Sequence, residues 1–407
     1  MGVKTTVRRS KSKPMRTPTA CPSCGGRGLK EFYDVRNVPV HSCLLMSSQE
    51  EALAFPTGNV VLGFCPSCGF ISNVAFDGSV QNYSPAYEDQ QCFSETFSVF
   101  HHDLTNRLVK KYDLRNKDIV EVGCGKGDFL ALLCELGNNR GVGIDPSVIP
   151  GRLQSPAADR ITFIQEHYSE RHARYQGDFV CCRHTLEHIP NTREFAQTMR
   201  RAIGNRLNTV IFIEVPDTIR VLREQAFWDI YYEHCSYFTL GSLARLFRSC
   251  EFEVTDLYLA FDDQYLLLEG CPANGATASR LAQEDDLEQT ARDVVLFVKR
   301  SRAKLESWKH RLEEIQCDRR RAVIWGSGSK CVAFLSTLCV RDEIEYVVDI
   351  NPHRHGKFLA GSGKKIWPPE SLREYKPDTV IVMNPIYAEE IRRDLHRMGL
   401  SPELVTL

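Results

Sequence analysis

The chain has 407 residues, of which 43% are hydrophobic and 25% charged, and its formal net charge is −1. This composition is typical of a soluble globular protein, and the length predicts about two to four domains. A net charge near zero gives no overall attraction to nucleic acid or to an anionic membrane. No apolar run reaches the ~18 residues of a membrane-spanning helix. We therefore expect neither a membrane nor a nucleic acid as the partner.

The N-terminus and the cysteines predict where the protein is located. Residues 1–19 are basic and almost free of apolar side chains, so they lack the core of a signal peptide. We interpret them as a disordered basic arm, with a nucleic-acid or partner tail as the alternative. Sixteen cysteines occur, many within apolar segments, which favours reduced, buried thiols over a disulfide scaffold. Together these features predict a cytoplasmic protein.

A five-residue cysteine motif, C-P-S-C-G, occurs twice within residues 20–80. Each copy is typical of a tight turn that brings two thiolates together, and two such turns supply four sulfur ligands, the set that zinc prefers in closed structural sites. The predicted zinc ligands are Cys21, Cys24, Cys65 and Cys68. Two C-x-x-C disulfides are the alternative, which a reducing compartment disfavours. His41 and Cys43 lie between the motifs without a spacing partner, so we predict that neither is a ligand.

Residues 119–129 read I-V-E-V-G-C-G-K-G-D-F, an apolar run followed by three alternate glycines and the start of a helical pattern. This pattern predicts a strand, a tight turn and a helix N-terminus, where glycine permits positive φ and backbone N–H groups face a ligand. The next predicted strand ends at Asp145, and 145 − 123 = 22 residues separate it from Gly123. That is close to the about 20 residues at which an acid reaches a ribose. The segment therefore predicts a nucleotide-type cofactor site.

The E-x-G-x-G-x-G form of residues 121–127 resembles motif I of class I S-adenosylmethionine-dependent methyltransferases, and the G-x-G-x-x-G spacing of dinucleotide-binding dehydrogenases is absent. Alternating strands and helices, ending in an antiparallel pair at 254–259 and 265–268, predict a doubly wound sheet over residues 81–271. The H-x-L-E-H-x-P stretch at 184–190 again resembles these enzymes, in which it lines the methionine side of the cofactor. The resemblance implies that S-adenosylmethionine is bound by Glu121, Gly123, Gly125, Gly127, Asp145 and His184.

Two further features of this region carry alternatives. His184 and His188 have the spacing of metal ligands on a helix, but Pro190 ends the segment and no third ligand is evident, so we disfavour a metal there. Upstream of the first core strand, Tyr83 and Tyr87 lie where methyltransferases often place a lid, and whether they face a substrate stays open. The i, i+4, i+7 spacing of phenylalanines 93, 97 and 100 predicts a core-facing stripe.

The stretch I-Y-Y-E-H-C-S-Y-F at residues 230–238 concentrates aromatic rings, an imidazole and a carboxylate just after the fifth predicted strand. A histidine beside a carboxylate is typical of a general base. We predict His234 as the base, with Glu233 and Tyr231 orienting it or a substrate oxygen. The alternative is a structural turn whose hydroxyl groups satisfy backbone atoms.

The last third of the chain predicts a long helix and a second glycine-turn domain. Residues 272–317 form a linker and a charged helix whose expected apolar positions are Val294, Val295, Val298, Leu305 and Leu312. Residues 318–407 repeat the pattern of strand, glycine turn and helix, which predicts a smaller Rossmann-like domain of substrate-binding type. The loop at Gly326 and Gly328 either binds a phosphate or only turns the chain, and both interpretations stay open.

From Cys21 to Leu407, the order of these features resembles that of the sugar C-methyltransferases acting on nucleotide-linked keto-deoxysugars. The resemblance implies that Tyr231, Glu233 and His234 lie at the active site. It also implies that the histidine removes the proton next to a keto group, that the enolate accepts the methyl group, and that the C-terminal domain caps the site. Two features depart from that family: Tyr232 stands where it usually has histidine, and residues 83–88 replace its serine-rich segment.

Two other functions remain as alternatives. One is an O- or N-methyltransferase of another small natural product, in which His234 deprotonates a hydroxyl group. The other is a zinc-containing nucleic-acid-binding protein on a degenerate methyltransferase fold, which the near-neutral charge and the intact glycine loop disfavour. The leading prediction is a cytoplasmic C-methyltransferase of secondary metabolism that uses S-adenosylmethionine and a structural zinc and acts on a small, nucleotide-linked sugar.

Overall fold

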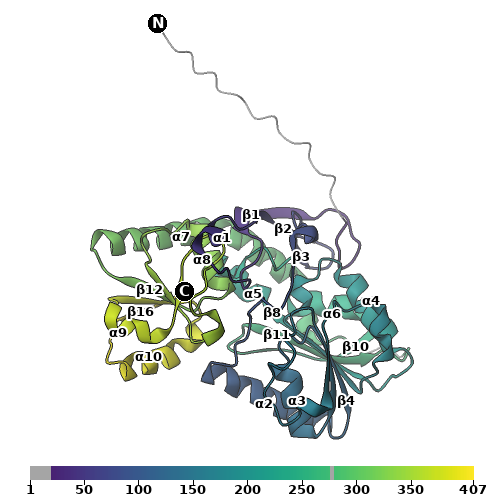
Figure 1. Ribbon diagram of the computed structural model, residues 1–407. Helices are drawn as coiled ribbons and strands as arrows, with labels where there is room; N and C mark the ends of the chain where they lie inside the picture. The colour runs from purple at the N-terminus through teal and green to yellow at the C-terminus, as the bar shows by residue number, and fades with distance from the viewer. Residues whose placement is uncertain (1–19, 276–278) are drawn as a thin grey trace.

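The computed structural model describes residues 20–275 and 279–407, and the predicted basic arm of residues 1–19 lies outside them. Within the described residues the strands form three sheets, of four, seven and five strands. Figure 1 shows the two α/β units side by side, with the N-terminal strands lying across the top of both. The first sheet belongs to the cysteine-containing module, the second to the central domain and the third to the C-terminal domain.

The central sheet has the strand order β10-β11-β8-β7-β4-β5-β6. Its strands are β4 (Asp118–Val122), β5 (Arg140–Ile144), β6 (Ile161–Ile164), β7 (Phe179–Arg183), β8 (Val210–Pro216), β10 (Phe252–Ala260) and β11 (Tyr265–Pro272). Strands β4 to β8 are parallel, whereas β11 runs antiparallel to both neighbours. The connections reverse direction between β4 and β7, and a ligand binds at the carboxyl ends beside such a switch point. This topology confirms the predicted class I methyltransferase fold.

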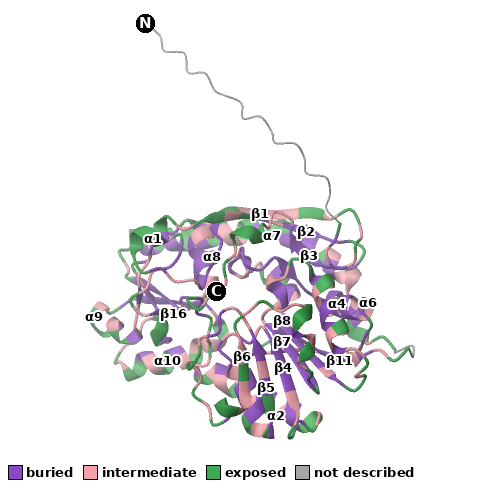
Figure 2. Cartoon of the chain, turned by 45° about the vertical axis from the view of Figure 1, so that its right-hand side comes forward, coloured by how far each residue is buried: buried purple, intermediate pink, exposed green. Residues whose placement is uncertain are grey.

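Helices cover both faces of this sheet. They are α2 (Glu95–Lys111), α3 (Asp128–Gly137), α4 (Thr192–Ile203), α5 (Thr218–Glu224) and α6 (Leu240–Ser249). Successive strand residues face opposite sides: Ile119 packs in the cluster under α2 and α3, and Val120 packs in the cluster under α4 and α6. Parallel strands covered on both faces are apolar along their whole length, as Figure 2 shows for the buried strands β4, β7 and β8.

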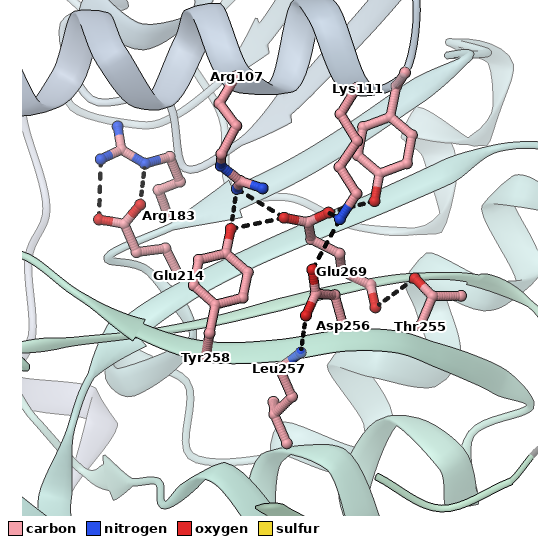
Figure 3. A network of polar contacts seen from close by, with 10 residues as sticks. Arg107, Lys111, Arg183, Glu214, Thr255, Asp256, Leu257, Tyr258 and Glu269 are labelled. Carbon is pink, nitrogen blue, oxygen red and sulfur yellow. Dashed lines mark hydrogen bonds and ion pairs between the residues drawn. The ribbon is translucent and has the colours of Figure 1, made fainter.

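A buried carboxylate fastens α2 to the antiparallel edge of the sheet (Figure 3). Glu269 of β11 accepts hydrogen bonds from Arg107 at 2.7 Å, Lys111 at 2.6 Å and Tyr258 at 2.6 Å. Burial alone would raise the pKa of Glu269, but the hydrogen bonds from Lys111 and Tyr112 hold it below its usual value. Because removing one partner of a buried charge is costly, this cluster fixes the position of α2 on the sheet.

The cysteine-containing module forms an antiparallel sheet in the order β1-β2-β3-β9. Its elements are β1 (Lys30–Pro39), α1 (Gln49–Leu53), β2 (Thr57–Phe64) and β3 (Ile71–Asn73). The fourth strand, β9 (Ser236–Tyr237), comes from the middle of the chain and pairs Tyr237 with Ile71. The module therefore does not close on residues 20–80 alone, because it takes a strand from within the predicted catalytic stretch, two residues after His234.

The C-terminal domain contains an all-parallel sheet in the order β14-β13-β12-β15-β16. Its strands are β12 (Ala322–Trp325), β13 (Tyr346–Val348), β14 (Ile366–Trp367), β15 (Thr379–Val382) and β16 (Glu403–Thr406). Its helices are α8 (Ser329–Leu338), α9 (Leu372–Tyr375) and α10 (Ala388–Arg397). The second Rossmann-like unit predicted from the sequence is present.

The long helix α7 (Leu287–Cys317) precedes this sheet. Its residues Val294, Phe297 and Leu312 are buried, but Val295 and Val298 are 53% and 47% exposed, so including those two valines in the apolar stripe was wrong. They lie off the helix face that packs against α5, α8 and β1. Within the described residues, no helix combines the length and apolar content needed to cross a membrane.

One apolar cluster joins the three parts of the molecule. It contains Val60 from the module, Trp228 from the central domain, Phe297 from α7 and Phe334 from α8. Because burial of apolar surface stabilises an interface in proportion to its area, we expect the module, α7 and the C-terminal domain to hold one arrangement around the central domain.

Candidate active site

A cavity of about 730 Å³ opens where the carboxyl ends of the central strands meet the C-terminal domain. Its wall includes the glycine loop after β4, the segment at 81–94, the residues that follow β7 and β8, and the loops after β12 and β15. This volume lies within the range of about 300–1,000 Å³ that is typical of small-molecule sites. The cavity brings most of the predicted site residues into one space.

The glycine loop adopts a conformation that other residues resist. Gly123, Gly125 and Gly127 have φ values of 73°, 53° and 91°, in the left-handed region where a Cβ atom is strained. A Cβ on Gly123 would lie 1.9 Å from the Thr185 hydroxyl oxygen, and one on Gly127 would lie 2.4 Å from the Phe163 ring. At Gly125 the nearest atom would be 3.7 Å away, so the loop is open towards the cavity at that position.

Asp145 completes the loop from the end of β5. Its Oδ2 accepts the Gly125 N–H at 3.0 Å, and its Oδ1 accepts the Ser147 N–H at 2.6 Å. The side chain also lines the cavity. An acid at this place beside a glycine turn is the arrangement that holds a ribose hydroxyl pair, so the residues present fit the ribose and amino-acid parts of S-adenosylmethionine.

Glu121 supports this loop from beneath. It is 2% exposed, and its Oε2 accepts the Leu130 N–H at 3.1 Å in the first turn of α3. Burial raises the pKa of Glu121 to about 8. The side chain therefore holds the strand, the glycine turn and the helix together, in addition to lining the cavity.

His184 occupies a strained, charged position directly after β7. Its φ is 47°, and its Nε2 lies 2.9 Å from Oε1 of Glu214, with Glu187 at 3.6 Å from Nδ1. Burial alone would lower the pKa of His184, but these two carboxylates raise it to about 9. Glu214 also forms a two-bond ion pair with Arg183, at 2.7 and 3.0 Å (Figure 3). His184 is thus a cation in the cavity wall at neutral pH.

The Y-x-E-H stretch places His234 and Tyr231 in the cavity wall. His234 Nε2 lies 2.9 Å from the Tyr231 hydroxyl oxygen. Burial, together with the nearby His188, His184 and Lys330, lowers the pKa of His234 well below its usual value. The imidazole is therefore neutral at physiological pH and able to accept a proton.

Glu233 differs from the role predicted for it, because its carboxylate does not orient the neighbouring His234. The carboxylate points into the cysteine-containing module, where Oε1 lies 2.8 Å from His41 Nδ1 and Oε2 accepts the Ser42 N–H at 2.9 Å. Burial alone would raise the pKa of Glu233, but these hydrogen bonds lower it. Glu233 is consequently an anchored anion behind the cavity wall.

Two residues beside His234 had no assigned role from the sequence. Whether Tyr83 faces a substrate was left open, and His188 was considered only as a metal ligand. The Tyr83 hydroxyl lies 2.8 Å from His188 Nδ1, and the His188 and His234 rings are 4.9 Å apart at an interplanar angle of 81°. Both Tyr83 and Tyr87 line the cavity. The sequence signal for His188 was its place in the H-x-L-E-H-x-P stretch, whereas His41 had no local signal.

The same histidines belong to a group that could hold a cation. Donor atoms of Glu187, His188 and His234 all lie within 4.8 Å of one another, so a third donor near His188 exists after all. However, His188 Nδ1 and His234 Nε2 already contact tyrosine hydroxyl groups. These contacts favour hydrogen bonding over metal binding at the two histidines.

The four motif cysteines meet as predicted. The Sγ atoms of Cys21 and Cys68 are 3.7 Å apart, as are those of Cys24 and Cys65, and all four lie within 4.8 Å of one another. Zinc–sulfur bonds of about 2.3 Å in a tetrahedron place neighbouring sulfurs about 3.8 Å apart. All sixteen cysteines are free thiols in the structure, so the donor set and its spacing fit a structural zinc.

The C-terminal domain closes the far side of the cavity. Lys330, at the start of α8, pairs with Asp229, which also accepts a hydrogen bond from Arg220 at 2.6 Å. Glu390 of α10 accepts hydrogen bonds from the Ser94 hydroxyl at 2.7 Å and the Thr96 N–H at 3.0 Å, and so caps α2 from another domain. These contacts place this end of the cavity between the two α/β units.

Comparisons with known proteins agree with this geometry. A family model described as a methyltransferase domain matches residues 92–257, and one described as a C-methyltransferase C-terminal domain matches residues 272–401. The chain is an S-adenosylmethionine-dependent methyltransferase. Among curated proteins it is similar to the C-methyltransferase NovU of Streptomyces niveus, with 28% identity over 322 residues, which are 73% of this chain and 74% of that protein.

Two of the solved structures that the chain matches are methyltransferases. The 1,6-didemethyltoxoflavin-N1-methyltransferase of Burkholderia thailandensis is 15% identical with a TM-score of 0.32, covering 44% of this chain and 82% of that one. The magnesium protoporphyrin IX methyltransferase of Synechocystis PCC 6803 is 16% identical with a TM-score of 0.33, covering 46% and 86%.

Proposed function

We propose that this methyltransferase methylates a carbon atom next to the keto group of a small, nucleotide-linked deoxysugar. The observation that carries the proposal is one cavity in which a glycine loop with its acid, Asp145, shares the wall with a neutral imidazole, His234. The similarity to a C-methyltransferase over most of the chain supports carbon as the acceptor.

Methylation of such a carbon needs a base and a stabilised oxyanion. The neutral His234 removes the proton next to the keto group, which leaves an enolate. Burial raises the pKa of Tyr231 and Tyr83 well above the usual value of 10, so both phenols keep their protons and can donate a hydrogen bond to the enolate oxygen. S-adenosylmethionine supplies the methyl group, which the enolate carbon bonds as the carbon–sulfur bond breaks. His234 then releases its proton to solvent.

Cationic side chains in the cavity wall, where the two α/β units meet, support an anionic, nucleotide-linked substrate. Lys330 and Arg220 both pair with Asp229, and Arg220 also pairs with Glu224, so two carboxylates balance the two cations. Among the described residues, the buried Arg220 Nε has no hydrogen-bond partner. Side chains of Lys330, Arg220 and Asp229 line the cavity. A diphosphate linking a sugar to a nucleoside is a group that free N–H donors of a guanidinium can bind.

The test is proton exchange followed by methyl transfer. Labelled S-adenosylmethionine is incubated with a panel of keto-sugar nucleotides, and the exchange of the substrate's α proton is followed in deuterated water. His234→Asn should slow both exchange and methylation by about 100- to 10,000-fold, with cofactor affinity retained. Equal turnover of the variant would remove His234 from the mechanism. Methylation of acceptors that have no acidic carbon would instead establish an O- or N-methyltransferase.

We also propose that the four motif cysteines bind one structural zinc. With four thiolate ligands no coordination position is left for water, so the metal stabilises the module and takes no part in the chemistry. Metal analysis should find about one zinc per chain, lost in Cys21→Ser together with module stability. A metal-free protein with unchanged thermal unfolding would reject the site.

A further inference from the structure

A buried histidine of the cysteine-containing module contacts the predicted catalytic stretch from behind. His41 follows β1 and is 1% exposed, and its partner Glu233 is also 1% exposed. The two residues are separated by 192 positions, and the distance between Nδ1 and Oε1 is 2.8 Å. His41 does not border the cavity and does not belong to the cysteine group. It therefore has neither the place of a base nor that of a metal ligand.

The hydrogen bonds fix the tautomer of this histidine. The backbone N–H of Asn82 donates to His41 Nε2 at 2.8 Å, so Nε2 carries a lone pair. The ring hydrogen of the neutral imidazole is then on Nδ1 and is donated to Glu233. With the Ser42 N–H on its other oxygen, the buried carboxylate has a donor on each oxygen atom.

The same ring also contacts the segment that carries Tyr83. The His41 and Tyr83 rings meet edge to face at 5.2 Å, and Tyr87 lies at 6.0 Å. Asn82, whose N–H binds His41, is the residue before Tyr83. One imidazole thus holds the backbone of the Y-x-E-H stretch through Glu233 and the backbone of the tyrosine segment through Asn82.

We propose that His41 is a positioning residue, which sets the distance between the His234–Tyr231 pair on one segment and Tyr83 on the other. The role of those groups in catalysis rests on the proposed function. Glu233 accordingly acts as the anchor of the Y-x-E-H stretch and not as a partner of the base. Pairing of Ser72 with Ser236 is a second tie between the module and this stretch, two residues beyond His234.

The physical reason for a large effect is the cost of an unpaired buried anion. Without the Nδ1 donor, Glu233 would be left with an unsatisfied oxygen in a closed site, which is costly enough to make the segment move or take up a proton. A misplacement of catalytic groups by about 1 Å can cost on the order of 100-fold in rate. His41 therefore acts on turnover through geometry, with the cofactor loop left untouched.

Three variants separate the two hydrogen bonds. His41→Phe removes both, and its kcat should fall on the order of 100-fold, with S-adenosylmethionine affinity unchanged. His41→Asn keeps an amide donor near the place of Nδ1 and should recover most of the lost kcat. His172→Phe is the matched control, because His172 is also buried and lies 3.1 Å from a carboxylate, that of Glu166, but neither of its hydrogen-bond partners, Glu166 and Ser169, lines the cavity.

Two further measurements distinguish positioning from general stabilisation. Glu233→Leu removes the acceptor of this contact and should lower kcat at least as much as His41→Phe does. The double variant should lose no more than Glu233→Leu alone, because the His41 contact is already broken in it. In wild-type protein with isotope-labelled histidine, nuclear magnetic resonance should show His41 as the neutral Nδ1–H tautomer. This spectrum requires no substrate, so it tests the contact even if the wild type methylates no keto-sugar and the proposed function fails.

Full turnover by His41→Phe, additive losses in the double variant or an Nε2–H tautomer would each overturn the proposal. A loss of kcat in His172→Phe equal to that in His41→Phe would do the same, since buried-histidine packing would then explain both.

Discussion

The two α/β units form the same turn with the same kind of hydrogen bond to an aspartate. In the central domain, the Gly125 N–H donates to Asp145 at 3.0 Å across 20 residues. In the C-terminal domain, the Ser327 N–H donates to Asp349 at 2.7 Å across 22 residues. In each unit a glycine follows the first strand, the acid follows the neighbouring parallel strand, and the loop lines the same cavity. One backbone motif therefore occurs twice in the chain.

The difference lies in what fills the turn. The second loop carries a side chain, and the Ser327 hydroxyl donates to Asp349 at 2.6 Å. Asp349 also accepts the Asn351 N–H at 2.8 Å and is 8% exposed. Arg354 closes the other side with a hydrogen bond to the Ser327 carbonyl at 2.9 Å. We infer that this loop turns the chain and closes on itself. In the first loop the residue whose N–H binds the acid is Gly125, which has no side chain to close the turn, so that loop stays open for a cofactor.

Alanine substitutions at the two loops test this comparison with the largest expected effect. Gly123→Ala forces a Cβ to within 1.9 Å of Thr185 at a φ of 73°, so it should cost about 2–5 kcal/mol of stability from strain and overpacking and abolish cofactor binding. Gly328→Ala is the control, because nothing lies within 4 Å of the added Cβ and φ is −78°. Thermal unfolding and calorimetry measure both. Normal cofactor affinity in Gly123→Ala would remove the loop from the cofactor site.

Substitution of the two acids should affect different properties of the protein. Asp145→Ala should weaken S-adenosylmethionine binding by roughly 1–3 kcal/mol, the value of a hydrogen bond to a charged group, as calorimetry would report. Asp349→Ala should leave that affinity unchanged. It should instead lower the free energy of unfolding by about 1–3 kcal/mol, because the buried donors of Ser327 and Asn351 lose their acceptor. If both variants lost cofactor affinity equally, the second loop would be open as well.

Patterns that are local in sequence predicted much of this structure. The apolar run that opens residues 119–129, the alternating glycines and the paired cysteine motifs each determine a turn or a strand within a few residues, so they could be identified without tertiary contacts. The two sheets followed from the order of these elements, since alternating strands and helices favour a parallel sheet.

Features set by distant partners could not be predicted in the same way. The His41–Glu233 contact spans 192 residues, and β9 joins the sheet of a module that begins more than 150 residues earlier. An adjacent carboxylate and imidazole in the sequence suggested a pair, but the chain turns Glu233 and His234 to opposite sides of the cavity wall. Sequence spacing predicts the face on which a side chain lies only within a helix or a strand. Residues 230–235 belong to neither.

The smallest expected effect concerns the first polar residue after the strand beside each glycine loop. In the central domain it is the charged His184, which is partly exposed and lies between Glu214 and Glu187. In the C-terminal domain the side chain of Asn384 instead exchanges two neutral hydrogen bonds with Gln264, at 3.0 and 2.9 Å.

The folded protein raises the pKa of His184 from 6.5 to about 9. Because this pKa is higher in the folded than in the unfolded protein, protonation of His184 stabilises the fold. The contribution is complete below about pH 6.5 and is lost as pH rises through about 9. Because the ring is partly exposed, we expect this contribution to the free energy of unfolding to be about 1–2 kcal/mol, less than the full pKa shift implies.

His184→Asn copies the neutral arrangement, and asparagine tolerates the φ of 47°. Denaturant unfolding of wild type across this pH window should show the decline, and the variant should not. A parallel decline in both proteins would assign the pH dependence to another group and leave His184 without the stabilising charge that distinguishes the central domain from its C-terminal counterpart.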